Sequence, residues 1–164
     1  MAEIRIKKRR RLRNREAKVL AQELHERLGR DVLSTEDIID IASSTDYDVI
    51  FVNGSILAII VEGKPFLTVR GILELGADRA FVTVDMGAVP YVANGADVMA
   101  PGVVDADRQL EEGDMVWIRD EKNARPLAIG KAMMSGSDMI SADSGKAVTS
   151  IHYVGDKLWK YDER

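Results

Sequence analysis

Short apolar runs broken by glycines fill the second half of the chain, and this pattern limits the fold more than any other feature. The runs alternate like strands, and Gly113, Gly136 and Gly145 stand between them. Several short strands at close spacing are typical of a small barrel. We predict strands at residues 79–84, 97–99, 115–119, 127–133, 147–154 and 158–161, with a short helix at 87–93.

The first half of the chain carries a different mixture of signals. Residues 15–28 place Leu20, Leu24 and Leu28 at helical spacing. The pair Asn53-Gly54 lies between two apolar runs, which is the pattern of a two-residue β-hairpin over 49–61. We also expect a strand at 3–7, a strand at 66–69 and a helical turn or two at 70–75.

A second helix and a domain boundary follow from the same kind of evidence. Ser34 with Asp37 three residues later resembles a capping box, so we expect a helix over 33–42. The mixed helix and strand signals end near residue 75, where the barrel-like pattern takes over. We therefore predict two domains, an α+β unit over 1–75 and a small barrel over 76–164, both within the usual size range of domains.

Charge is distributed unevenly along the chain. The formal net charge is −4, but residues 1–30 hold eleven Lys or Arg against four Glu, a balance of +7, which leaves −11 in the remainder. A basic segment of this kind is a candidate contact for a polyanion, although a solvated face is the alternative. Because the charge continues into the 15–28 helix beside a separate apolar stripe, we favour contact with RNA or the ribosome.

Composition argues against most enzyme and metal chemistry. The chain has no cysteine, and His25 and His152 are its two histidines, so a thiolate nucleophile, a disulfide framework and a zinc ribbon are excluded. We find no paired catalytic carboxylates and no nucleophile with a base, and we predict no enzymatic activity, no cofactor and no metal. A hydrophobic content of 46% with 30% charged residues is typical of a globular protein.

The same survey bears on location in the cell. No apolar run approaches the roughly 20 residues of a membrane span. The amino terminus lacks the apolar core of a secretory signal. We therefore expect a cytoplasmic protein with no membrane partner.

The segment around residues 94–119 is suited to close approach by another polymer. Gly95 and Gly102 stand where apolar strands break, and the small residues Ala96 and Ala100 flank them. The glycines can equally be no more than barrel corners. Under the first interpretation the loop is a backbone-lined surface for RNA.

Three blocks of sequence closely resemble the PUA domain, which is named after pseudouridine synthases and archaeosine transglycosylases. The blocks are Gly87-Ala-Val-Pro-Tyr-Val-Ala-Asn-Gly-Ala-Asp-Val-Met-Ala-Pro-Gly-Val, Glu112-Gly-Asp-Met-Val-Trp-Ile and Ala128-Ile-Gly-Lys-Ala, and the match spans about residues 79–155. They arrive in the order found in the family. The resemblance implies the PUA fold, a mixed β pseudo-barrel that binds structured RNA.

The arrangement of the whole chain adds a narrower resemblance. A basic α+β unit before a PUA barrel looks like the ligatin and malignant-T-cell-amplified-sequence family of translation factors, and archaeal stand-alone PUA proteins share this arrangement. The resemblance implies a function in translation initiation or recycling, with the tRNA acceptor end and the small ribosomal subunit as partners.

The resemblance also implies which residues contact RNA. They lie in the helix and glycine loop between the first two barrel strands and in or near the last strands: Gly87, Ala88, Tyr91, Asn94, Gly95, Ala96, Met99, Pro101, Gly102, Lys131 and His152. Exposed main-chain amides of such a loop can donate to phosphates or base edges. Secondary phosphate contacts are expected from the basic run, namely Lys7, Lys8, Arg9, Arg10, Arg11, Arg13 and Arg15.

Several candidates have a structural interpretation beside the functional one. Tyr91 can stack on a base or pack into the core. Lys131 lies in an apolar strand, so it must point outward or be paired, and we favour a phosphate contact. His152 lies in an alternating strand, where a surface histidine without a function is the simpler interpretation. We expect Asp114 to bond to local amides in a turn rather than to act in catalysis.

The leading hypothesis is a non-enzymatic protein that binds structured RNA, either tRNA or rRNA, in translation. One alternative is an RNA-binding accessory subunit of a tRNA or rRNA modification enzyme. The other is a protein-interaction adaptor whose hairpin over residues 49–61 presents an edge strand to a partner.

Overall fold

The computed structural model describes residues 3–161, and their packing forms two compact units. One unit comprises the residues up to Asp78 together with those from Lys157 onward, and the other comprises Arg79–Asp156. The sequence assigned every residue after 75 to one domain. By packing, the helix that starts at Lys157 belongs with the amino-terminal unit.

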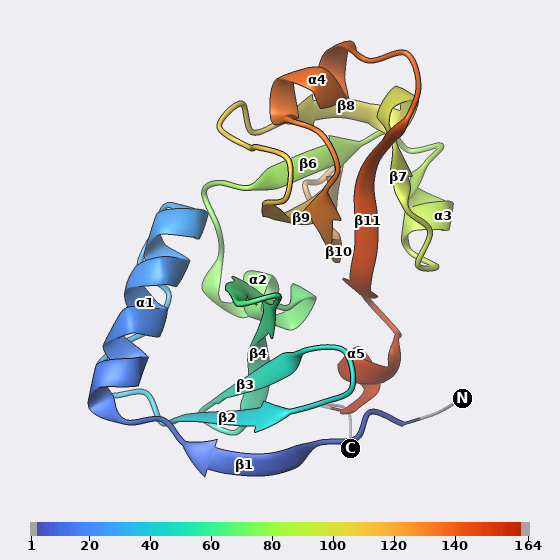
Figure 1. Cartoon of the computed structure of the whole chain (residues 1–164). Helices are drawn as coiled ribbons and strands as arrows, with labels where there is room; N and C mark the ends of the chain where they lie inside the picture. Colours follow the sequence, from blue (N-terminus) through green and yellow to red (C-terminus); the bar gives the residue numbers. More distant parts are fainter. Residues whose placement is uncertain (1–2, 162–164) are drawn as a thin grey trace. The chain divides into compact units, whose positions relative to one another are not determined.

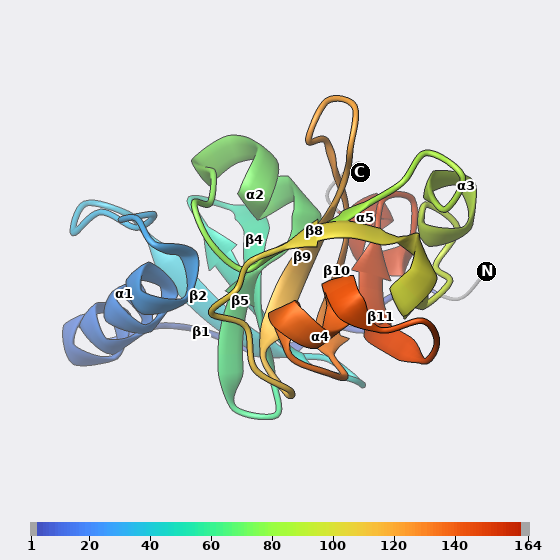
Figure 2. The same ribbon diagram turned by 90° about the horizontal axis from the view of Figure 1, so that it is seen from above.

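The amino-terminal unit is built on an antiparallel sheet with strand order β1-β2-β3-β4-β5 (Figure 1). Each strand pairs with the next one along the chain, so among the described residues β1 and β5 are the outer strands. Helix α1 packs beside this sheet, and its main contact among the strands is with β5 (Figure 2). The strands are β1 (Lys7–Arg11), β2 (Ile39–Ser43), β3 (Asp48–Val52), β4 (Ser55–Val61) and β5 (Lys64–Leu67), and the helices are α1 (Asn14–Leu28), α2 (Val69–Leu75) and α5 (Lys157–Tyr161).

Helix α1 forms because its apolar residues recur at every fourth position. Leu20, Leu24 and Leu28 are all buried, and Leu24 and Leu28 are completely inaccessible to solvent. A stripe of this spacing faces one side of a helix, which here is the sheet. The helix ends where Gly29 adopts the left-handed conformation and donates its amide hydrogen to the carbonyl of His25. The helix predicted at 15–28 is confirmed.

The β3–β4 hairpin is also confirmed. Asn53 and Gly54 have φ values of 52° and 96°, and two successive positive values are what a type I′ turn requires. The hairpin lies inside the sheet, with β2 on one side and β5 on the other. The adaptor hypothesis needed this hairpin to offer a free edge, and in that respect it was wrong.

Two predictions for the amino-terminal unit fail. The helix expected over 33–42 is absent, and a turn at residues 35–36 leads into β2 instead. The Ser34 amide donates to the Asp37 carboxylate at 2.8 Å, so the capping pattern closes a local turn without starting a helix. The β-branched Ile38, Ile39 and Ile41 that follow favour a strand. The strand expected at 3–7 lies further on, because the basic run itself forms β1.

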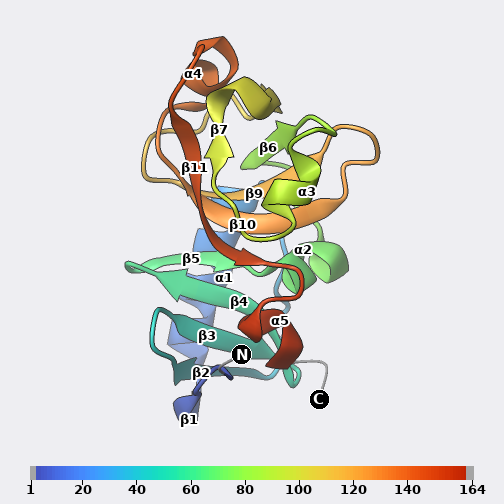
Figure 3. The same ribbon diagram turned by 90° about the vertical axis from the view of Figure 1, so that its right-hand side faces the viewer.

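The second unit contains a mixed sheet with strand order β7-β11-β10-β9-β6-β8. The β6–β9 pairing is parallel and the other pairings are antiparallel. Helix α3 lies beside β10 (Figure 3), and α4 lies beside β8 (Figure 1). The strands are β6 (Phe81–Val84), β7 (Val98–Met99), β8 (Val103–Ala106), β9 (Met115–Asp120), β10 (Pro126–Ala132) and β11 (Lys146–Tyr153), and the helices are α3 (Val89–Val92), η1 (Ala100–Gly102) and α4 (Gly136–Ser141).

The sequence predicted most of this unit. Strands at 79–84, 97–99, 115–119, 127–133 and 147–154 and the helix at 87–93 correspond to β6, β7, β9, β10, β11 and α3. Strand β8 and helix α4 were not predicted. The strand expected at 158–161 is helix α5, because five residues are too few to distinguish a period of two from a period of 3.6.

Among residues 3–161, no helix is both long enough and apolar enough to cross a membrane.

The turn of the β3–β4 hairpin gives a clean test of backbone conformation. We expect Gly54→Ala to lower the free energy of unfolding by about 1–2 kcal/mol, because an alanine at this φ brings its Cβ against its own backbone. Among the described residues, apart from Gly54 itself and its two neighbours in the chain, no atom lies within 4 Å of a Cβ placed at this position, so packing adds nothing to the cost. Urea unfolding measures the change. Gly54→Asn should cost less, since asparagine tolerates this conformation. Equal losses for the two variants would contradict the explanation.

Candidate nucleic-acid interface

The segment of residues 85–102, which we name the α3 segment, contains most of the predicted RNA contacts. Its two ends are joined, because the Asp85 amide donates to the Gly102 carbonyl at 3.0 Å. The Asp85 carboxylate then accepts the Ala88 amide at 2.8 Å and closes the turn before α3. Val92 is buried and fixes α3 against the unit. The segment is thus a structured surface element.

Tyr91 projects from this segment into solvent. Its side chain is 70% exposed, the largest exposure among the large apolar side chains of the described residues. Met86 and Met99 of the same segment are also exposed, at 42% and 50%. From the sequence, Tyr91 could either stack on a base or pack into the core. Its exposure in the structure shows that it does not pack into the core. An exposed aromatic ring is the type of side chain on which unpaired bases stack.

Position 95 requires a glycine for a structural reason that the sequence did not indicate. Its φ is 95°, and a Cβ built there would lie 2.6 Å from Cε1 of Tyr153. The space beside Gly95 is therefore occupied by the ring of this residue of the same unit. Gly102 likewise faces Ala88, whose Cβ would lie 3.3 Å from an added Cβ. The missing side chains of Gly95 and Gly102 therefore make room for other residues of the protein, and not for a ligand, on the sides that face Tyr153 and Ala88.

The main-chain amides of the α3 segment are also largely used. The amides of Asn94 and Ala96 donate to the Tyr91 carbonyl at 3.1 and 3.0 Å, and the Gly95 amide donates to the Val92 carbonyl at 3.0 Å. These groups close turns and are not free to donate to a phosphate. The segment can therefore contact a ligand mainly through side chains, which differs from the predicted backbone-lined surface.

The charge of this unit also differs from that of a general RNA-binding surface. Residues 79–156 hold seven Lys or Arg against twelve Asp or Glu, a net formal charge of −5. Lys146 pairs with Asp97 at 2.9 Å, and this lysine together with the Ser150 amide holds the pKa of the Asp97 carboxyl below its usual value. Arg108 pairs with Asp105 at 2.9 Å. These cations are engaged within the protein.

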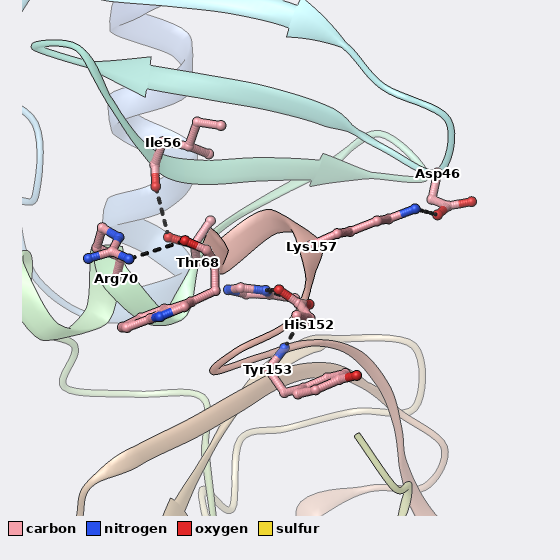
Figure 4. A network of polar contacts seen from close by, with 9 residues as sticks. Asp46, Ile56, Thr68, Arg70, His152, Tyr153 and Lys157 are labelled. Atoms are coloured by element: carbon pink, nitrogen blue, oxygen red, sulfur yellow. Dashed lines mark hydrogen bonds and ion pairs between the residues drawn. The ribbon is translucent and has the colours of Figure 1, made fainter. Parts of the chain in front are cut away.

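Two predicted contacts lie in the strands β10 and β11. Lys131 is half-buried in β10. His152, which Figure 4 labels, is only 1% exposed, and its Nδ1 lies 2.9 Å from Oδ2 of Asp156. The prediction of a surface histidine was wrong, and a ring at this depth does not reach a ligand on the surface. The sequence did offer one sign of this burial, because Asp156, a possible partner for the histidine, follows four residues later, just after Gly155.

The turn predicted at Asp114 is confirmed. Its carboxylate accepts the Glu111 amide at 2.9 Å, which is a local structural bond. Among residues 3–161, no group of three or more His, Asp or Glu side chains is arranged to hold a metal ion.

The basic run forms the outer strand β1, and all five of its side chains are exposed. Arg9 and Arg11 both reach Asp40 of β2, with Nε to carboxylate distances of 2.9 and 2.6 Å. The Arg9 guanidinium also lies 3.7 Å above the ring of Phe51, a cation–π contact. Arg11 and Arg9 together hold the pKa of Asp40 below its usual value. The two arginines are therefore ordered, not freely solvated.

Arg10 has a different partner from its neighbours. Its two Nη atoms donate to the two carboxylate oxygens of Glu16 in α1, at 2.9 and 2.8 Å. The hydrogen bond from Arg10, aided by the Arg13 amide, lowers the pKa of Glu16 to about 2. This bidentate pair joins β1 to the first turn of α1.

The remaining basic candidates are exposed. Within residues 3–161, Lys7, Lys8, Arg13 and Arg15 form no ion pair. Lys8 has a φ of 57° and lies at the bulge between Lys7 and Arg10 in the β1–β2 pairing. These side chains stay candidates for phosphate contacts.

Comparison with protein families matches residues 80–154 to the PUA domain. An uncharacterised protein of Methanocaldococcus jannaschii is 39% identical over 131 residues, which are 80% of this chain and 81% of that protein. The solved structure of a hypothetical protein from the hyperthermophilic archaeon Pyrococcus horikoshii superposes with a TM-score of 0.86 at 36% identity, covering 94% of this chain and 99% of that one.

Two further relatives carry names that refer to translation or to the family named above. Translation machinery-associated protein 20 of Saccharomyces cerevisiae is 37% identical over 86 residues, 49% of this chain and 48% of that protein. Malignant T-cell-amplified sequence 1 of Danio rerio is 29% identical over 116 residues, 68% of this chain and 64% of that protein. The match thus spans about half to two thirds of these two proteins.

Gly95 and Tyr153 provide a test of the packing in the α3 segment. We expect Gly95→Ala to lower the free energy of unfolding by about 2 kcal/mol or more, because it adds an unfavourable φ to a contact of 2.6 Å. Gly87→Ala is the matched control, since an added Cβ there lies 3.3 Å from Asp85 Oδ1 and its φ is not in the left-handed region. Thermal unfolding of both variants measures the difference. A wild-type melting temperature for Gly95→Ala would show that the ring of Tyr153 does not fill this space.

The Arg10–Glu16 pair predicts a specific pH dependence. The pKa of Glu16 falls from 4.5 to about 2 in the folded protein, so its stabilising effect is complete above about pH 4.5 and is lost as the pH falls toward 2. We therefore expect wild type to be more stable than Glu16→Gln near neutral pH, with the difference shrinking below about pH 4.5. Urea unfolding at a series of pH values measures it. A difference that stays constant with pH would rule out this ionic origin.

Proposed function

The chain belongs to the PUA-domain family, in the group that includes archaeal PUA proteins and the malignant-T-cell-amplified-sequence proteins, and from this we propose that it binds the acceptor end of tRNA in translation. The PUA match and the relative named for its association with the translation machinery support an RNA-binding role in translation. The choice of the tRNA acceptor end as the ligand rests on the features of the site described next.

The exposed ring of Tyr91 carries the proposal. A side chain that is 70% exposed on a structured helix is available to a ligand without any rearrangement. The single-stranded end of a tRNA offers unstacked bases, and a base stacked on an aromatic ring contributes about 1–3 kcal/mol. The exposed Met86 and Met99 add apolar surface in the same segment.

The acidic character of the PUA unit makes base stacking more important for this site. A net charge of −5 does not attract a phosphate backbone, so binding there depends on the bases. The exposed cations of β1 other than Arg10, which pairs with Glu16, and those of the start of α1 supply the phosphate contacts in this proposal. The contacts are either to the same tRNA or to rRNA of the small ribosomal subunit. The protein acts without catalysis, in the cytoplasm, by positioning or recycling RNA.

A filter-binding assay tests the function and the site together. We expect wild-type protein to bind tRNA with an affinity that falls steeply as KCl is raised, and to bind tRNA without its 3′-terminal CCA at least about tenfold more weakly. Tyr91→Ala should lower the affinity for intact tRNA by the same factor, whereas Tyr91→Phe, which keeps the ring, should bind tRNA as wild type does. No tRNA binding by wild type even at low salt would refute the function.

Two controls separate the loss of a contact from damage to the fold. Tyr91 is largely exposed, so Tyr91→Ala should change the free energy of unfolding by no more than about 0.5 kcal/mol. Leu73→Ala removes another exposed apolar side chain, from α2, and should leave tRNA binding unchanged. If Tyr91→Ala binds intact tRNA as wild type does, the ring is not part of the site.

A further inference from the structure

We infer that Arg9 and Arg11, held by Asp40, form a binding site for an RNA phosphodiester, and that the neighbouring Arg10 is not part of it. We name this arrangement the Arg9–Asp40–Arg11 clamp. The inference rests on the proposed function, since it assigns phosphate contacts to particular side chains. The sequence of the basic run does not reveal this distinction, because Arg9, Arg10 and Arg11 are chemically identical.

The hydrogen-bond geometry leaves donors available in the clamp. Arg9 Nε donates to Asp40 Oδ2 at 2.9 Å, and Arg11 Nε donates to Asp40 Oδ1 at 2.6 Å. A guanidinium group has five N–H donors, and each arginine uses only its Nε on the carboxylate. Among the described residues, the Nη groups of both arginines have no hydrogen-bond partner. These groups can donate to phosphate oxygens in the bidentate way that arginine favours.

The charge of the clamp is positive. Two guanidinium groups and one carboxylate give a net charge of +1. Asp40 stays ionised, because the hydrogen bonds from Arg11 and Arg9 hold its pKa below the usual value. The carboxylate is well covered, with 13% side-chain exposure, whereas the side chains of Arg9 and Arg11 are 45% and 64% exposed. The clamp therefore presents its positive groups to solvent and covers its negative one.

Both arginines are held in place before any ligand arrives. The Arg9 guanidinium lies 3.7 Å above the ring of Phe51, and that ring is buried. Asp40 lies in β2 and is paired in register with Arg11 of β1. An ordered guanidinium loses less conformational entropy on binding than a freely rotating side chain does. The clamp lies on an outer strand, where a long polymer has access.

Arg10 differs because its carboxylate partner engages two of its five N–H donors, one on each Nη atom, and not the Nε alone. Both of its Nη atoms are used by the two oxygens of Glu16, so the pair is neutral. Alternation along β1 places Arg10 on the opposite side of the strand from Arg9 and Arg11. Arg10 therefore joins β1 to α1, and it serves as a control that lies in the same strand but forms a neutral, bidentate pair.

Protection of the sheet edge is the competing explanation for these charges. Outer strands commonly carry basic residues that prevent pairing with a second chain. Under that explanation, removal of Arg9 and Arg11 causes self-association and leaves RNA affinity unchanged. The two explanations thus differ in a measurable way.

The test compares Arg9→Gln/Arg11→Gln with Arg10→Gln in the tRNA filter-binding assay over a series of KCl concentrations. Each lost phosphate contact lowers the slope of log affinity against log salt by about 0.7 on a single strand and about 0.9 on a duplex, so we expect the double variant to lose about 1.4–1.8. Arg10→Gln should keep the wild-type slope. Arg11→Gln alone, which removes the more exposed side chain, should lose about half as much and serves if the double variant does not fold.

Each outcome decides for or against the clamp. If wild type binds tRNA and the double variant keeps the wild-type slope, the clamp is refuted while the proposed function stands. A double variant that forms dimers in size-exclusion chromatography with an unchanged slope assigns the arginines to edge protection. An equal loss of slope in Arg10→Gln refutes the distinction between neighbours. If wild type does not bind tRNA, the proposed function and the clamp both fail.

Discussion

The pairing of β10 with strands on both of its sides is the interaction on which the PUA unit depends. β10 bonds to β9 on one side and to β11 on the other, and Leu127, Ala128 and Ile129 are buried within it. Helix α3 lies against this strand and is fixed there by the buried Val92. Because one face of so short a helix is fixed in the core, Tyr91 on the other face must point to solvent. The exposed ring is thus a consequence of the central pairing.

The two units divide the physical requirements of RNA binding between them. The PUA unit has a net charge of −5 and offers an exposed aromatic ring, whereas residues 1–30 have a net charge of +7 and place arginines on an outer strand. An acidic surface with a stacking residue favours unpaired bases and disfavours nonspecific contact with the phosphate backbone. A basic strand has the opposite preference. Under the proposed function, each unit contacts a different part of a nucleic acid.

Sequence patterns predicted the elements whose signals are local and failed where tertiary contacts decide. The leucine stripe of α1 and the Asn53-Gly54 turn depend on a few neighbouring residues, so both predictions were confirmed. The capping pattern at Ser34 is also local, but the pairing of β2 with β3 overrode it. Burial of His152 depends on Asp156 and the packing of the end of β11, which periodicity does not reveal. The exposure of Tyr91 could not be predicted from a helix of four residues, because it depends on how α3 packs against the rest of its unit.

The same limitation governs the basic run, and here it changes the chemistry. In the sequence, Arg9, Arg10 and Arg11 are equivalent positive charges, so counting them suggests three phosphate contacts. Their partners are distant in the chain, with Asp40 about thirty residues away and Glu16 on a helix that begins only after the strand ends. Strand alternation sends neighbouring arginines to different carboxylates, so that Arg9 and Arg11 each give one N–H donor and Arg10 gives two. Availability for a ligand therefore depends on how each guanidinium is bonded, through Nε alone or through both Nη atoms, and a count of positive charges in the sequence does not reveal it.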